Sequence, residues 1–182
     1  MSEEMFVRQC APTLAGVKTG SLFSCPYDTR EGMTEDVRRL NRVLVPKGLL
    51  LPLRYSEKRV LLYLYRPTEL WRDLNDDKAA EILDAAGYSC TDCDRCVVKL
   101  IQRLRGNKDF PHEIGLFLSY PPEDVKGFID NNAANFKYSG LWKVYGDEKR
   151  AKAMFEKFKK CTDIYCRMWQ AGVSLDRLAV SA

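Results

Sequence analysis

The sequence predicts a helix-rich α+β fold in a single domain spanning residues 1–182. Two apolar runs, residues 49–55 and 59–65, are separated by only three residues, which is typical of a β-hairpin. A stripe of apolar residues at helical spacing runs from Ala151 to Met168 and predicts one long helix. No repeat, low-complexity tract or Pro/Gly/Ser-rich linker divides the chain. Its 182 residues are enough for one domain with a substantial core.

The predicted sheet is small and mainly antiparallel. The run 59–65 is apolar on both faces, which suits a strand that is covered on both sides. Pro52 has no N–H to donate to a neighbouring strand, so the run 49–55 is expected at an edge of the sheet. A third strand is expected at about residues 136–145.

The first third of the chain predicts two helices. A short helix is expected over residues 3–9, interrupted by Pro12, and residues 13–33 are expected to be irregular. Thr34 is a suitable N-cap, and apolar residues at helical spacing follow it, so a second helix is expected over 34–44.

Further helices follow the hairpin. One opens at Pro67, the next covers 77–86 before Gly87, and another runs from an N-cap at Thr91 to Gly106. Residues 111–119 fit a helix with Pro111 in its first turn, although their pattern also fits a strand. The remaining expected helices are 122–130 and the long helix, which Asp147 caps and Gly172 ends.

The composition is mildly basic. Lys and Arg number 29 against 25 Asp and Glu, which gives a net charge of +4 and a pI of about 8.6. Nucleic-acid-binding domains more often have a pI above about 9, so a nucleic-acid partner is disfavoured. No run approaches the roughly 18 apolar residues of a membrane span, and the acidic first residues lack the apolar core of a signal peptide. We therefore expect a cytoplasmic protein without a membrane partner, whose cysteines are thiols.

Three of the seven cysteines lie at a repeated spacing of three: Cys90, Cys93 and Cys96. A C-x2-C pair is a common chelating unit, and a helix N-terminus favours the thiolate form. These cysteines therefore predict a zinc or iron–sulfur site, or a redox site. The alternative is that they pack structurally at the helix entry, because the local sequence offers no fourth ligand.

Other residues are candidates for the same chemistry. Cys161 lies on the apolar stripe of the long helix, where a core role is the alternative to a metal role. His112 is the only histidine, and with Glu113 it would lie in the first turn of a helix. There, backbone N–H groups bind anions, and a neutral imidazole serves as a base or metal ligand. The alternative is a histidine that is hydrogen-bonded locally.

The basic side of the long helix is a candidate surface for phosphate groups. The simpler interpretation is the solvated face of an amphipathic helix. Its residues are Lys149, Arg150, Lys152, Lys157, Lys159, Lys160 and Arg167.

Several runs together resemble an uncharacterised domain-of-unknown-function family of anaerobic, clostridia-like bacteria. The longest is residues 111–129, PHEIGLFLSYPPEDVKGFI, and another is 142–146, WKVYG. The resemblance also includes residues 10–18, 61–67 and 160–162, and so covers nearly the whole chain. It implies a bacterial cytosolic protein and brings no established activity. The cysteine triplet lies outside these runs.

The leading hypothesis is a binding or redox-linked domain that takes a metal or an anionic small molecule. Its pocket would be formed by residues of the family-like runs: Cys10, Lys18, Arg66, His112, Glu113, Lys143 and Tyr145. His112 would act as ligand or base, and Arg66 or Lys143 would hold negative charge. A non-catalytic protein-interaction module is the alternative, and nucleic-acid binding is a second one.

Overall fold

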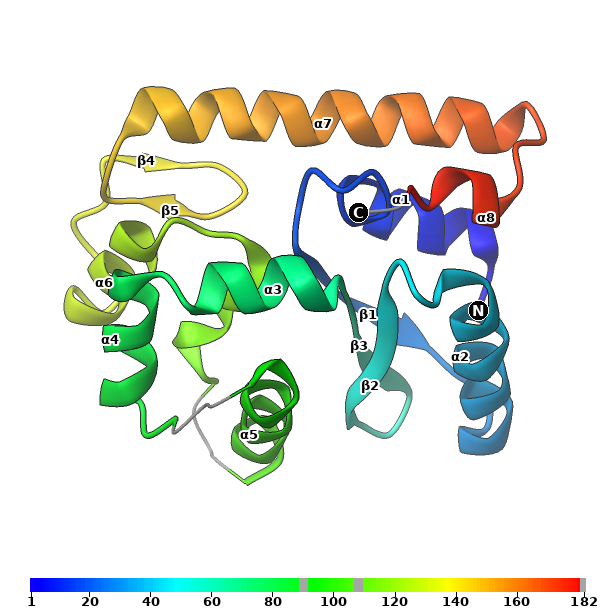
Figure 1. The fold of residues 1–182 in the computed structure, drawn as a ribbon, viewed down its shortest axis with the longest axis horizontal. Helices are drawn as coiled ribbons and strands as arrows, with labels where there is room; N and C mark the ends of the chain where they lie inside the picture. Colours follow the sequence, from blue (N-terminus) through cyan, green and yellow to red (C-terminus); the bar gives the residue numbers. More distant parts are fainter. Residues whose placement is uncertain (89–91, 107–109, 181–182) are drawn as a thin grey trace. The chain divides into compact units, whose positions relative to one another are not determined.

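The computed structural model describes residues 1–88, 92–106 and 110–180 (Figure 1). The chain forms two compact units, and each is described by itself. The first comprises Met1–Pro67 and Phe158–Ala182, and the second comprises Thr68–Lys157. The helix-rich α+β class predicted from the sequence is confirmed. Among the described residues, no helix combines the length and apolarity needed to cross a bilayer.

The first unit contains a three-stranded antiparallel sheet in the order β1-β3-β2 (Figure 1). Strands β2 (Leu49–Tyr55) and β3 (Arg59–Tyr65) form the predicted hairpin. β3 is central and is largely buried on both faces. β2 is an edge strand with a register shift between Pro52 and Arg54, because proline cannot donate to the ladder.

The other edge strand, β1 (Gly20–Pro26), corrects a prediction. It lies within residues 13–33, which the sequence predicted to be irregular. Its composition, with glycine, serine, cysteine and proline, gives a weak strand signal. The strand forms because its residues pair along the full length of β3, from Gly20 opposite Tyr65 to Pro26 opposite Arg59.

Helices α1 (Glu3–Leu14) and α2 (Arg30–Leu44) pack on this sheet, α1 against β1 and α2 against β2. Two predicted boundaries were wrong. Thr29, not Thr34, caps α2, and its hydroxyl accepts a hydrogen bond from the Gly32 N–H. α1 continues through Pro12, whose missing N–H removes only one bond near the C-terminal end of the helix.

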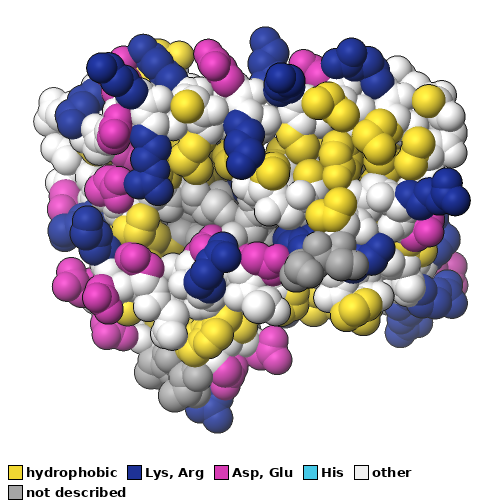
Figure 2. Space-filling view, turned by 45° about the horizontal axis from the view of Figure 1, so that its top comes forward, with side chains coloured by type: hydrophobic (Ala, Val, Ile, Leu, Met, Phe, Trp, Pro, Cys, Tyr) yellow, Lys and Arg dark blue, Asp and Glu magenta, His cyan; other side chains and the backbone are white. Residues whose placement is uncertain are grey.

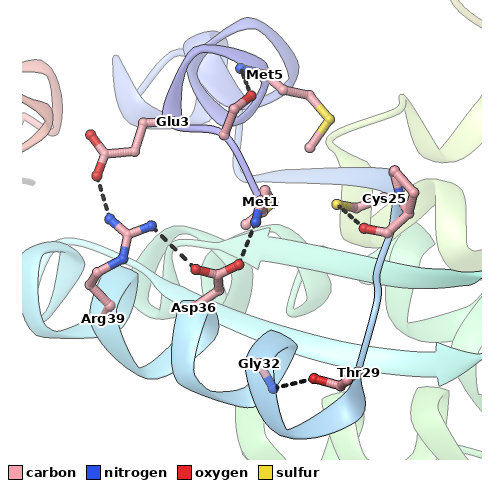
Figure 3. A network of polar contacts seen from close by, with 10 residues as sticks. Met1, Glu3, Met5, Cys25, Thr29, Gly32, Asp36 and Arg39 are labelled. Carbon is pink, nitrogen blue, oxygen red and sulfur yellow. Dashed lines mark hydrogen bonds and ion pairs between the residues drawn. The ribbon is translucent and has the colours of Figure 1, made fainter.

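Polar contacts join the N-terminal end of α1 to the middle of α2 (Figure 3). Arg39 of α2 contacts Glu3 of α1, and Asp36 contacts both Arg39 and the amino group of Met1. Partial burial alone would raise the pKa of Asp36, but these two cations together hold it below its ordinary value. The core beneath the helices is apolar. It includes Phe6, Cys10, Leu40, Leu62 and Leu178.

The second unit is mainly helical. It contains α3 (Pro67–Leu74) from its second residue on, α4 (Asp77–Ala85), α5 (Cys93–Gly106), a 3₁₀ helix η1 (His112–Leu118) and α6 (Pro122–Asp130). These positions confirm the predicted helices, and Gly87 after α4 has the positive φ of +79° that its position requires. Thr91, the predicted N-cap of α5, lies outside the described residues.

The predicted third strand at 136–145 is two short strands, β4 (Tyr138–Ser139) and β5 (Lys143–Val144). They form their own two-stranded sheet and do not extend β1-β3-β2. The turn between them includes Gly140, which breaks the run.

The long helix α7 (Glu148–Gln170) begins in the second unit and continues into the first, where α8 (Leu175–Leu178) follows it. Asp147 accepts a hydrogen bond from the Arg150 N–H, as expected for an N-cap.

Candidate functional site

A pocket of about 650 Å³ opens in the second unit, between α4, the end of α5, the start of η1 and α6. We call it the α4–α6 pocket. Its apolar lining includes Ile82, Ala85, Phe110 and Ile129. Its charged or polar lining includes Glu81, Arg103, His112, Glu113, Lys126 and Asp130. The start of the family-like run, Pro111, His112 and Glu113, therefore forms part of the pocket wall.

The close packing of η1 on α6 fixes this wall. A Cβ on Gly115 would lie 2.7 Å from Cγ2 of Val125, so only glycine allows this approach. Ile114, Leu116 and Phe117 of η1 are buried. Burial of these side chains holds the preceding residues at the rim of the pocket.

Glu113 is a buried acid in an internal polar network. It is 3% exposed, and its Oε1 lies 2.6 Å from Arg103 Nε and accepts a hydrogen bond from the Tyr88 hydroxyl at 3.0 Å. Burial, together with the Glu113 carboxylate, raises the pKa of Tyr88 far above its ordinary value. The Arg103 guanidinium also donates to the Ala86 carbonyl at 2.8 Å. The network thus ties η1 to α5 and to the end of α4.

His112 has the opposite environment from its neighbour. Its side chain is exposed at the pocket, with its ring centroid 4.9 Å from that of Phe128. Its ring nitrogens make no hydrogen bond to any residue that the structure describes. The predicted alternative of a locally bonded helix-start histidine therefore does not describe this side chain, and the imidazole is available to a ligand.

The other charges of the pocket differ in how they are paired. Lys126 and Asp130 form an exposed ion pair of 3.2 Å along α6. Glu81 on α4 is exposed and has no ion pair or hydrogen bond from its side chain within the described part of the chain. An exposed i,i+4 pair contributes little free energy, so its charges can exchange partners with a ligand.

Lys143 and Tyr145 are not among the described residues that line the α4–α6 pocket. They hold a turn in which Asn132, Ala133 and Asn135 have positive φ. The Lys143 ammonium donates to the Ala133 carbonyl at 2.7 Å, and the Tyr145 hydroxyl donates to the Ala134 carbonyl at 2.9 Å. Both polar groups therefore stabilise a strained turn in this structure.

Sequence reasoning missed Asp124, a buried carboxylate of α6. It accepts three hydrogen bonds of 2.7 Å, from Trp142 Nε1, the Tyr145 N–H and the Gly146 N–H. It thereby joins the runs 111–129 and 142–146. The local sequence gives no clear signal for this burial, because Glu123 and Lys126 lie beside Asp124 and the segment is typical of an ordinary charged helix start.

The remaining predicted pocket residues lie in the first unit. Cys10 is fully buried, and burial raises the pKa of its thiol far above the ordinary value. Burial lowers the pKa of Lys18 to about 8, against an opposing effect of Cys10. Arg66 is 2% exposed and donates to the Val180 carbonyl at 3.0 Å. Cys161 is a half-buried thiol on α7.

The cysteine triplet is only partly described. Cys90 lies outside the described residues, and Cys96 is buried and disulfide-bonded, which differs from the expectation of thiols throughout. Burial raises the pKa of Cys93 to about 11, and Asp94 and Asp92 add to the shift. Burial and the two aspartates thus oppose the thiolate form that a helix N-terminus favours, and redox use of this thiol stays a prediction. Within the described ranges, no group of three or more His, Cys, Asp or Glu side chains is placed to hold a metal.

Comparison with protein families gives one finding. The chain matches the family described as Protein of unknown function (DUF3793) over residues 6–179, and it therefore belongs to this family. No curated protein and no solved structure matches the chain. The resemblance to a family of unknown function is confirmed, while the bacterial source and the cytoplasmic location stay predictions.

Proposed function

We propose that this member of a family of unknown function binds a small organic molecule in the α4–α6 pocket. The ligand would have an apolar body and an acidic group. The sequence suggested either a metal or an anionic small molecule as the ligand, and the geometry of the pocket supports the anionic small molecule better. Its binding residues would come from the second unit.

The observation that carries the proposal is the pocket itself. Its volume of about 650 Å³ falls within the roughly 300–1,000 Å³ of small-molecule sites. Such sites combine a mainly apolar lining with a few polar groups. Ile82, Ala85 and Ile129 would contact the apolar body of the ligand, and Arg103 and His112 would face its polar end.

Arg103 is suited to bind an acidic group because its guanidinium is held in place. Ala86 and Glu113 fix its position before any ligand arrives, which lowers the entropy cost of binding. His112 would donate a hydrogen bond from an otherwise unbonded ring nitrogen.

The alternatives have less support. If the chain were a protein-interaction module, a large apolar patch and no pocket beside His112 would be expected. The structure has a pocket beside His112. Nucleic-acid binding would favour clustered cations. On the face that Figure 2 shows, Lys and Arg side chains along the long helix alternate with acidic ones.

The test uses 8-anilinonaphthalene-1-sulfonate, a fluorescent probe with an apolar body and one acidic group. Ala85 is exposed on α4 and lines the pocket, so Ala85→Trp would fill it without entering the core. We expect this variant to weaken probe binding by at least about tenfold, which corresponds to about 1.4 kcal/mol. Calorimetry gives the affinity and the stoichiometry, which should be one probe for each chain.

Ala153→Trp is the matched control, because Ala153 is exposed on α7 outside the pocket. It should leave probe binding unchanged. His112→Ala should weaken binding by a smaller factor, since it removes one hydrogen bond. Equal probe affinity in the wild type, Ala85→Trp and His112→Ala would refute the proposal.

A further inference from the structure

We infer that the ligand of the α4–α6 pocket is a free α-amino acid with an apolar or aromatic side chain, bound as the zwitterion. The inference rests on the proposed function and narrows it to one class of compound. It comes from two charged side chains of the described residues: Arg103, which uses only part of its hydrogen-bonding capacity, and Glu81, whose carboxylate makes no ion pair or hydrogen bond to them. An amino acid carries one group of each complementary charge.

Arg103 provides the site for the carboxylate. A guanidinium has five N–H donors, and only one of them makes a hydrogen bond to the described part of the chain, through Nη1 to the Ala86 carbonyl. Nε lies 2.6 Å from Glu113, but its N–H does not point at the carboxylate. The other Nη donors are therefore available. Arg103 is only partly exposed, so the fork is held at the pocket wall, ready for a bidentate contact.

Glu81 provides the site for the ammonium group. It lines the pocket from α4, and its carboxylate has no cation beside it within the described ranges. Among the described residues that line the pocket, three bear carboxylates, Glu81, Glu113 and Asp130, and two are permanent cations, Arg103 and Lys126. Because carboxylates outnumber permanent cations in this described lining, it favours a ligand that brings a positive charge together with its acidic group.

The apolar lining provides the site for the side chain of the ligand. Ile82 and Ala85 lie on α4 beside Glu81, and Ile129 lies on α6. Phe110 is 43% exposed, which leaves an aromatic surface for contact with a ring. An amino acid with a polar side chain would offer no apolar surface to contact this apolar lining.

The experiment measures affinity by calorimetry for three related probes on the full chain. L-phenylalanine has both charges, 3-phenylpropanoate lacks the ammonium group, and 2-phenylethylamine lacks the carboxylate. We expect L-phenylalanine to bind at least about tenfold more tightly than either analogue, because each analogue lacks one hydrogen-bonded charged group; tenfold corresponds to about 1.4 kcal/mol. L-phenylalanine should also displace the naphthalenesulfonate probe, and Ala85→Trp should abolish its binding.

Glu81→Gln isolates the contact to the ammonium group. We expect it to lower the affinity for L-phenylalanine by about tenfold or more and to leave 3-phenylpropanoate unaffected or slightly better bound. Asp84→Asn is the control, because it removes one carboxylate from the exposed side of α4 outside the pocket. It should change neither affinity.

Two results would overturn the inference and leave the proposed function intact. One is naphthalenesulfonate binding that Ala85→Trp abolishes, with no binding of L-phenylalanine or of L-leucine as a second probe. The other is L-phenylalanine binding no more tightly than 3-phenylpropanoate, or equally tightly to Glu81→Gln. If none of the probes binds the wild-type chain, both the inference and the proposed function fail.

Discussion

Glu113 and His112 are adjacent in the sequence, yet the structure gives them different roles. A 3₁₀ helix has three residues per turn, so neighbouring side chains point about 120° apart. Glu113 therefore faces inward to Arg103 and Tyr88, while His112 faces the pocket. The sequence identified both residues as candidates. It did not distinguish their roles, because the partners of Glu113 are distant in the sequence.

The buried position of Glu113 makes a prediction about stability. Glu113→Gln keeps the shape of the side chain and removes the charge that faces Arg103. We expect it to lower the free energy of unfolding by about 1–3 kcal/mol, the cost of a buried polar group that loses its partner. The measurement is urea denaturation at pH 7, followed by tryptophan fluorescence.

Glu156→Gln is the control for this variant. Glu156 is exposed on α7 in the same unit, and its side chain has no ion pair with the described residues. Its replacement should change stability by less than about 0.5 kcal/mol. If Glu113→Gln were as stable as this control, the buried network would not be a stabilising feature.

At the scale of elements, local sequence signals correctly predicted the helices that local interactions stabilise. α4 has its glycine terminator, and α7 has its N-cap and apolar stripe, all within the helices or next to them. β1 was missed because its stability comes from pairing with β3, about 40 residues further along the chain. The third strand of the sheet is therefore β1, and not the segment at about 136–145 that the sequence indicated.

The close contact between α6 and Tyr145, after β5, allows a prediction about stability when Gly127 is replaced. A Cβ on Gly127 of α6 would overlap the Cβ and ring of Tyr145. Gly127→Ala should therefore cost about 1–3 kcal/mol, as expected when extra volume is forced into a packed contact. Thermal unfolding measures the change.

Gly106→Ala is the matched substitution with the opposite expectation. Gly106 ends α5, and a Cβ there would meet nothing within 4 Å. The variant should be neutral, or more stable by up to about 1 kcal/mol, because alanine loses less backbone entropy than glycine. If both variants had equal stability, the close approach of α6 and Tyr145 would not be real.

At the scale of the whole molecule, the residues predicted for one pocket belong to two compact units. Cys10, Lys18 and Arg66 lie in the first, and His112 and Glu113 lie in the second. Sequence reasoning grouped them because they occur in family-like runs. Such runs mark positions that matter to the fold as well as to a site, and Arg66 and Cys10 are both buried in the first unit.

The half-buried Lys18 should give the stability of the molecule a measurable dependence on pH. Burial lowers its pKa from 10.5 to about 8 in the folded state. Between about pH 8 and pH 10.5, Lys18 is therefore protonated in the unfolded chain and largely neutral in the folded chain. The free energy of unfolding therefore rises with pH across this range. Below about pH 8 the amine is charged in the folded state too, and burying that charge lowers the stability.

Comparison with Lys18→Met isolates this contribution, because the other groups titrate similarly in both proteins. We expect the unfolding free energy of the wild type, relative to the variant, to be constant below about pH 7 and to increase from about pH 8 to 10.5. Urea denaturation at five or six values of pH measures the difference. A difference that stays constant up to pH 10.5 would mean that Lys18 keeps its ordinary pKa. The ammonium would then be solvated in the folded state, and Cys10 would lie beside a permanent positive charge throughout the physiological range.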